Sequence, residues 1–99
     1  MPAIVRLGDP TTTGHGCDAV TTVIGPSGNV FANGLGVERQ GDPTAPHTIP
    51  AGPACVPHGA AINVGSSNVF TNGIPTARVG DSTDGGSIIA GSPNVYVNG

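Results

Sequence analysis

"NVFTNGIPTARVGDST" occupies residues 68–83, and both of its halves recur elsewhere in the chain. The first half returns as "NVFANG" at residues 29–34 and as "NVYVNG" at residues 94–99. The second half returns as "RLGDPT" at residues 6–11 and as "RQGDPT" at residues 39–44. Three copies of each phrase in a chain of 99 residues predict three similar structural units.

Each unit reads as a β-hairpin. Apolar and small or polar residues alternate before an Asn-Gly pair, which suits a type I′ turn with positive φ at both central residues. Nine residues separate Asn33 from Asp42, and nine again separate Asn72 from Asp81, so turn and Gly-Asp pair belong to one unit. The sequence therefore predicts an all-β fold with pseudo-threefold symmetry.

The third unit is divided between the two ends of the chain. "AIVRLGD" at residues 3–9 is a second strand without a first, and residues 91–99 supply a first strand and its turn. We expect Val95–Val97 to pair with Ile4–Arg6 and to close the ring of three hairpins. The prediction is one domain over residues 1–99, with hairpins at 25–42, 65–81 and 91–99 completed by 1–9, joined by connectors at 10–28, 43–67 and 82–93.

All the positive charges share one repeat position, namely Arg6, Arg39 and Arg78. Three residues later come Asp9, Asp42 and Asp81, whose carboxylates we expect to cap turns by accepting backbone N–H groups. The arginines could pair with them in a ring of surface ion pairs.

Charge and composition exclude several classes of protein. The net charge is −3 and lysine is absent, so the basic patch that nucleic acid requires is missing. The N-terminus shows no signal peptide, and no stretch is apolar enough for stable membrane insertion. We expect a chain made in the cytoplasm, where a disulfide between Cys17 and Cys55 is disfavoured. With only three aromatic residues the core is small, so a metal or a partner would help to hold it.

Every histidine and both cysteines lie in the first two connectors. If the connectors converge at one end, they supply a tetrahedral zinc site. The favoured ligands are His15, His47, Cys55 and His58, with Cys17 competing for the sulfur position. Such a closed site would be structural, with one zinc per chain, although the residues do not exclude iron.

A catalytic role is weakly supported, because no G-x-S-x-G motif is present and four ligands leave zinc no open position. We therefore predict that the protein is not an enzyme. The alternative is a small zinc-dependent hydrolase or toxin delivered as cargo.

The repeated phrases, and above all "IPTARVGD" at residues 74–81, resemble the PAAR-repeat proteins along the whole chain. "PTAR" and "GVER" depart from the Pro-Ala-Ala-Arg signature. The resemblance implies a short β pyramid whose tip is tied by a zinc ion on three histidines and a cysteine. The histidines would be His15, His47 and His58. Some relatives carry the cysteine in the last connector, where this chain has Asp84 and Gly85, which leaves Cys55 or Cys17.

The resemblance also implies a role and a partner. PAAR-repeat proteins cap the spike of type VI secretion systems and of related phage tails, and sharpen it for piercing. We expect a chain that is monomeric when free and binds, one copy per trimer, to a homotrimeric β-helical spike, with any effectors it carries. It would be made in the bacterial cytoplasm and end at the tip of the machine, secreted or on a virion tail. The sequence does not separate these two machines.

Overall fold

The computed structural model describes residues 1–98 as short strands joined by turns. Ten strands form five antiparallel hairpins. They are β1 (Pro10–Thr12) with β2 (Val20–Thr22), β3 (Phe31–Ala32) with β4 (Leu35–Gly36), β5 (His47–Ala51) with β6 (Ala54–His58), β7 (Phe70–Thr71) with β8 (Ile74–Pro75), and β9 (Ser82–Thr83) with β10 (Gly86–Ser87). No helix of membrane-spanning length and hydropathy occurs in this part of the chain.

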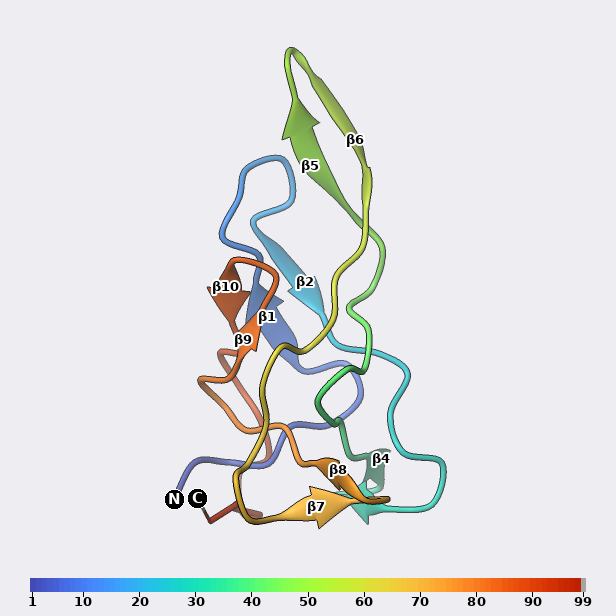
Figure 1. The fold of residues 1–99 in the computed structure, drawn as a ribbon, viewed down its shortest axis with the longest axis vertical. Coiled ribbons are helices and arrows are strands. Elements are labelled where there is room, and N and C mark those ends of the chain that lie inside the picture. Colours follow the sequence, from blue (N-terminus) through green and yellow to red (C-terminus); the bar gives the residue numbers. More distant parts are fainter. Residues whose placement is uncertain (99) are drawn as a thin grey trace.

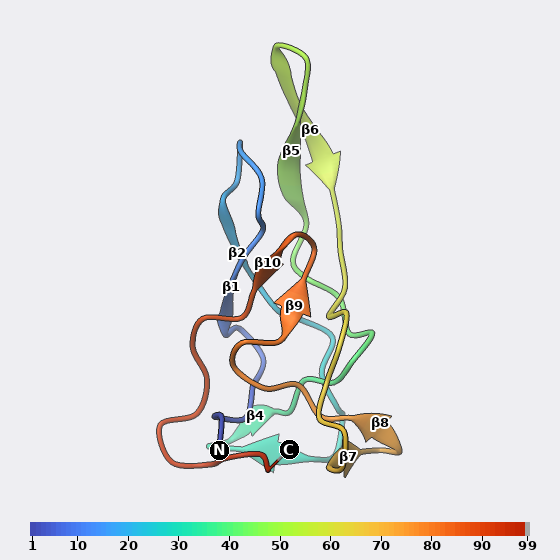
Figure 2. The same ribbon diagram turned by 60° about the vertical axis from the view of Figure 1, so that its left-hand side comes forward.

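The molecule tapers along its long axis, with extents of 42 × 23 × 22 Å. Its wide end, the base, holds β3, β4, β7, β8 and both termini (Figure 1). The β1–β2 and β9–β10 hairpins stand above the base, and β5–β6 rises beyond both to the narrow end (Figures 1 and 2). The all-β pyramid expected from the sequence is confirmed.

Two of the base hairpins turn on the Asn-Gly pairs. Asn33 and Gly34 have φ values of 54° and 77°, and Asn72 and Gly73 have 55° and 76°. Ala32 pairs with Leu35 across the first of these turns, so the loop has two residues. Positive φ at both central positions is the type I′ geometry that the sequence predicted.

Three backbone hydrogen bonds form a closed ring that links the three repeat units. The N–H of Glu38 donates to the Val5 carbonyl at 3.0 Å, Val5 to Ala77 at 3.2 Å, and Ala77 to Glu38 at 3.0 Å. These residues precede Arg39, Arg6 and Arg78, so the ring joins equivalent positions of the three units.

The chain ends close this ring, as expected, but in a different register. Ala3 pairs with Tyr96, the N–H of Ile4 donates to the Val95 carbonyl at 2.9 Å, and the N–H of Val97 donates to Pro2 at 2.8 Å. The partner of Val95–Val97 is therefore Pro2–Ile4, not Ile4–Arg6. Arg6 is unavailable because it bridges to Val37 of the next hairpin.

The core is a narrow stack of small and β-branched side chains. Its apolar cluster is Val23, Ile62, Ile88, Val5 and Ala77, each at most 1% exposed. Val23, Ile62 and Ile88 each follow one of the three Gly-Asp pairs, whereas Val5 and Ala77 belong to the backbone ring. The layer above is polar but equally buried, and in it the hydroxyls of Thr11 and Thr83 lie 2.5 Å apart. The core therefore consists of few side chains and contains no aromatic residue among those described.

Each Arg-x-Gly-Asp phrase forms the same closed turn. In the first, the Asp9 carboxylate accepts from the Arg6 backbone N–H at 2.8 Å and from the guanidinium Nε and NH2 at 3.1 and 3.0 Å. Gly8 has φ of 87°, and its equivalents Gly41 and Gly80 have 90° and 95°, which favours glycine there. The aspartates are 5–7% exposed, so these ion pairs are more deeply placed than the surface pairs that the sequence suggested.

Each connector contains a hairpin of its own. The first holds β1–β2, the second β5–β6 and the third β9–β10. These three hairpins point toward the narrow end and carry the residues of the candidate site (Figure 1).

Candidate metal centre

Two of the histidines are opposite each other on one hairpin. His47 begins β5 and His58 ends β6, and the two are direct partners in the antiparallel register. Side chains of such partners project to the same face of the ribbon. Both therefore stand at the root of the hairpin, while its turn at Gly52 lies farther toward the narrow end (Figure 1).

The third histidine and an aspartate come from the two other upper hairpins. His15 lies in the loop between β1 and β2, and Asp84 lies in the turn between β9 and β10 with φ of 53°. The backbones of that turn and the first loop are in direct contact, because Gly85 donates its N–H to the Thr13 carbonyl at 3.0 Å. A Cβ at Gly14 would lie only 2.4 Å from the Gly85 backbone, so glycine permits this approach.

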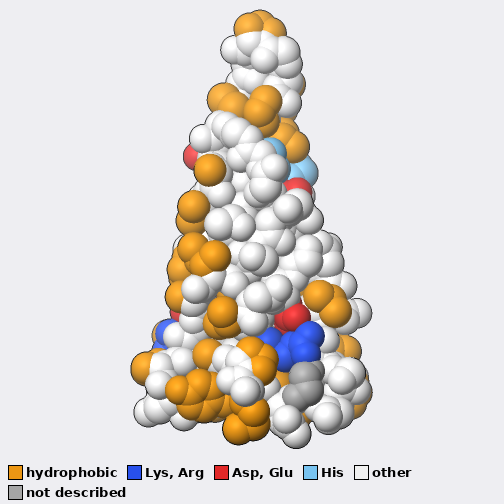
Figure 3. Space-filling view, turned by 90° about the vertical axis from the view of Figure 1, so that its left-hand side faces the viewer, with side chains coloured by type: hydrophobic (Ala, Val, Ile, Leu, Met, Phe, Trp, Pro, Cys, Tyr) orange, Lys and Arg blue, Asp and Glu red, His pale blue; other side chains and the backbone are white. Residues whose placement is uncertain are grey.

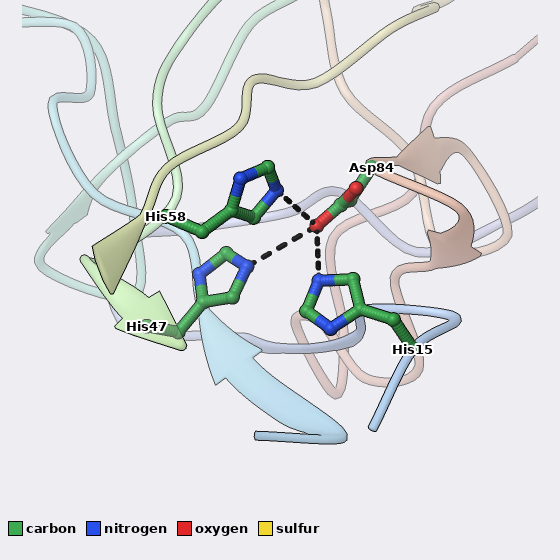
Figure 4. Close-up of side chains that lie close together, drawn as sticks. All are labelled: His15, His47, His58 and Asp84. Carbon is green, nitrogen blue, oxygen red and sulfur yellow. Dashed lines mark hydrogen bonds and ion pairs between the residues drawn. The ribbon is translucent and has the colours of Figure 1, made fainter. Parts of the chain in front are cut away.

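The four side chains converge on one point (Figure 4). Asp84 Oδ2 lies 2.7 Å from Nε2 of His15, 3.1 Å from that of His47 and 3.0 Å from that of His58. The four potential ligand atoms all lie within 4.8 Å of one another. A tetrahedral zinc ion with bonds of about 2.0–2.1 Å separates its ligands by about 3.4 Å, so ligation requires the Asp84 oxygen to move outward from the three nitrogens and the more widely spaced ligand atoms to approach one another.

Hydrogen bonds orient two of the rings for ligation. His15 Nδ1 lies 3.0 Å from the Gly16 carbonyl oxygen, and His47 Nδ1 lies 2.9 Å from that of Ala45. A carbonyl only accepts, so Nδ1 carries the proton and Nε2 of the neutral ring presents its lone pair. Nitrogen lone pairs that point at the Asp84 carboxylate would repel it unless a positive charge lies between the nitrogens and the carboxylate. Protons on the imidazole rings or a metal ion can supply that charge.

The pKa shifts of His15 and Asp84 have the directions expected of oppositely charged groups held close together. The hydrogen bond to Gly16 raises the pKa of His15 above its usual value, and Asp84 adds to the effect. Burial alone would raise the pKa of Asp84, but its hydrogen bonds with the three histidines outweigh burial and lower it. The His47 side chain is 2% exposed, those of His15 and Asp84 are 15% and 17% exposed, and that of His58 is 27% exposed, so the centre is partly shielded from water.

Cys17 and Cys55 do not join the histidines, contrary to the prediction from the sequence. Cys17 and Cys55 form a disulfide, with Cα atoms 5.9 Å apart, so neither offers a thiolate. The expectation of free thiols and of Cys55 as a ligand is wrong in this structure. Along β6, Cys55 and His58 are three residues apart, and this odd spacing turns their side chains to opposite faces.

The structure brings together three of the four predicted site residues, the histidines, and adds Asp84. Asp84 was not predicted, because only histidine and cysteine were considered as metal ligands and the third connector has neither. The available signal was symmetry, because each upper hairpin contributes at least one donor and Asp84 lies in the two-residue turn of the third. This set could hold a metal ion.

Comparison with known proteins supports one family. No curated protein matches the chain closely enough to count as a relative. The PAAR motif family, in contrast, matches residues 7–87, which span the upper hairpins, both Asn-Gly hairpins and all four residues of the candidate centre. The protein therefore belongs to the PAAR motif family.

Proposed function

We propose that this protein is the non-catalytic tip of a contractile injection machine and that its base caps a homotrimeric β-helical spike. One chain would bind per spike trimer. The observation that carries this proposal is the base, where three equivalent strand pairs, two hairpins and the paired chain ends, present equivalent exposed aromatic residues. Membership of the PAAR motif family supports the same role.

The aromatic residues of the base are Phe31, Phe70 and Tyr96, which are 61%, 56% and 52% exposed. They occupy the same position of the three repeated phrases, directly before the buried residues Ala32, Thr71 and Val97. Hydrophobic side chains gather at this wide end (Figure 3). Three similar apolar contacts about one axis match a partner built from three identical subunits.

The narrow end supports a piercing role. There the three upper hairpins approach one another, and too few side chains meet to form an apolar core. We propose that one structural zinc ion per chain ties these hairpins through His15, His47, His58 and Asp84. The β5–β6 hairpin continues beyond the centre as the leading element (Figure 2).

The donor set favours a structural metal over a catalytic one. Three imidazoles and one carboxylate fill a tetrahedral shell, whereas hydrolytic zinc keeps a position for water. The protein would act by mechanical insertion, driven from behind, and be delivered with its spike. The machine could be a type VI secretion system or a phage tail, since both require the same tip.

The test is the stoichiometry of the complex. Purified protein is mixed with a homotrimeric β-helical spike, and the mass of the complex is measured by light scattering. A mass of one chain per spike trimer is expected. A complex with three chains per trimer, or no complex with any spike encoded beside this protein, would refute the proposal.

A further inference from the structure

The disulfide and the candidate metal centre join the same two segments. His15 and Cys17 lie two residues apart in the β1–β2 loop, and Cys55 and His58 lie three residues apart on β6. The two cysteines are 38 residues apart in the sequence. The loop and the hairpin are thus held together twice, once by the disulfide and once at the histidine centre.

The four donors of the centre differ in how firmly the fold places them. His47 and His58 are set by the β5–β6 register, and the Asp84 turn is fixed by its backbone contact with Thr13. His15 depends on the conformation of a loop without strand pairing between residues 13 and 19. Its position relative to the hairpin is therefore the variable one.

Few contacts other than the disulfide dock this loop on the hairpin. Asp18 accepts hydrogen bonds from the Thr48 backbone N–H and hydroxyl, both at 2.8 Å and both exposed to solvent, and its own N–H donates to the Thr48 carbonyl at 3.3 Å. Exposed hydrogen bonds contribute little net stability. Cys17 also adopts φ of 66°, a left-handed conformation that a non-glycine residue keeps only where its surroundings hold it. The disulfide is the covalent link that does so.

We propose that the Cys17–Cys55 disulfide is a positioning crosslink that holds His15 against His47 and His58, so that metal affinity depends on the redox state of the two cysteines. The inference rests on the proposed metal site. When the disulfide is intact, the loop is ordered before the ion binds. When it is reduced, binding must supply the cost of ordering the loop, and affinity falls.

The coupling is reciprocal, because a disulfide that favours metal binding is itself favoured by bound metal. A trialkylphosphine is a suitable reductant. It breaks the S–S bond and becomes a phosphine oxide, while water supplies the oxygen atom and the two protons that complete the thiols of Cys17 and Cys55. Bound metal should therefore make the disulfide harder to reduce at equilibrium.

Free thiols could have the opposite effect. Thiolate is a stronger zinc ligand than carboxylate, so a released Cys55 or Cys17 that displaced Asp84 would raise the zinc affinity. The doubly substituted chain Cys17→Ser/Cys55→Ser removes the crosslink without creating a thiol. It therefore separates loss of positioning from ligand exchange.

The first experiment measures the zinc dissociation constant by competition with a chromophoric chelator. We compare the oxidised protein, the phosphine-reduced protein and the Cys17→Ser/Cys55→Ser variant, with circular dichroism as the check on folding. Val97→Ala, which weakens the core of the base far from the centre, is the matched control. We expect zinc affinity to fall by about 10-fold or more in the variant and to stay unchanged in the control.

Equal or higher zinc affinity in the Cys17→Ser/Cys55→Ser variant would overturn the positioning role while leaving the metal site intact. Absence of zinc from the oxidised protein would overturn the metal site as well. The two failures are therefore distinguishable.

The second experiment needs no variant of the cysteines. The protein is equilibrated with fixed ratios of reduced to oxidised glutathione, with and without zinc at a chelator-buffered free concentration, and the thiols are then alkylated and counted by mass spectrometry. We expect zinc to shift the ratio at which half of the disulfide is reduced at least severalfold in the wild type, toward more reducing conditions, and to have no effect in His58→Ala. An unchanged midpoint in the wild type would contradict the coupling.

Discussion

Glu38 and Val5 are neighbours in the backbone ring, where the N–H of Glu38 donates to the carbonyl oxygen of Val5 at 3.0 Å. Both side chains are fully buried, yet one is a carboxylic acid. Neither carboxyl oxygen of Glu38 has a hydrogen-bond partner. The equivalent residue of the unit at 65–81 is Ala77, so the fold does not require an acid at this position.

Glu38→Val should raise the stability of the protein at neutral pH and remove part of its pH dependence. Burial raises the pKa of Glu38 to about 8, with Asp42 adding to the effect. Between the ordinary Glu pKa of 4.5 and about 8, the folded state keeps a proton that the unfolded state has lost. The stabilisation present at lower pH is therefore lost as the pH rises, by at most about 1.4 kcal/mol per pH unit.

The measurement is urea denaturation of wild type and Glu38→Val from pH 5 to pH 9. The difference between the two free energies of unfolding isolates Glu38 from other titrating groups. It should grow with pH in favour of the variant and level off above the raised pKa. A difference independent of pH would show that Glu38 titrates normally.

Asp42→Asn should destabilise the protein by about 2–3 kcal/mol, because it removes charge-assisted hydrogen bonds from a shielded position. The Asp42 carboxylate accepts from the Arg39 backbone N–H at 2.8 Å and from its guanidinium at 2.9 Å. By symmetry, Asp81→Asn should cost about the same. Thermal denaturation of both variants tests this, with Asp18→Asn as an exposed control; a loss no larger than that of the control would contradict it.

The base could be predicted from the sequence because local chemistry decides it. The Asn33-Gly34 pair specifies a turn, and the phrase around Arg6 recurs with its aspartate. The predicted pairing of the two chain ends was wrong by two residues. Arg6 pairs with Val37 of another unit, and no local sequence pattern indicates such a contact between units. Likewise, the β5–β6 hairpin contains Pro50 and Pro57, which argue against strand in a sequence and are tolerated here in an isolated two-stranded ribbon.

The candidate site was predictable in its histidines and not in its fourth member. His15, His47 and His58 are the only histidines, and their connectors converge by symmetry. Cys55 was wrongly predicted as a ligand, because the sequence does not reveal that it lies on a strand whose geometry turns it away from His58. Asp84 was overlooked because a carboxylate before glycine is also an ordinary turn residue.

Phe31→Ser and Phe70→Ser should each weaken binding to a trimeric spike by at least about 2 kcal/mol, the loss typical of a central aromatic contact. Both residues are more than half exposed in the free protein, at 61% and 56%, so the free energy of unfolding should change by no more than about 0.5 kcal/mol. Calorimetric titration with the spike measures the first quantity and urea denaturation the second. Val20→Ser, at an exposed residue of β2, is the control and should bind normally.

If Phe31→Ser and Phe70→Ser bound the spike as tightly as Val20→Ser, the base would not be the docking surface. A variant that lost binding and stability together would be uninformative about docking, so Phe31 and Phe70 are chosen for their exposure. Their symmetry gives a further check, because the two losses should be of similar size.

Asp84→Asn should lower zinc affinity by at least about 10-fold, because it replaces the only anionic donor of the centre with a neutral amide. Asparagine has nearly the same shape and accepts the positive φ of 53° at this turn, so the backbone contact between Gly85 and Thr13 should persist. Phe31→Ser, at an exposed residue of β3 in the base, is the control and should leave zinc affinity unchanged. Chelator competition on the two variants and the wild type gives the ratio. Since bound metal stabilises the folded state by mass action, zinc should also raise the melting temperature of wild type more than that of Asp84→Asn; equal rises would remove Asp84 from the centre and leave the three histidines as its only ligands.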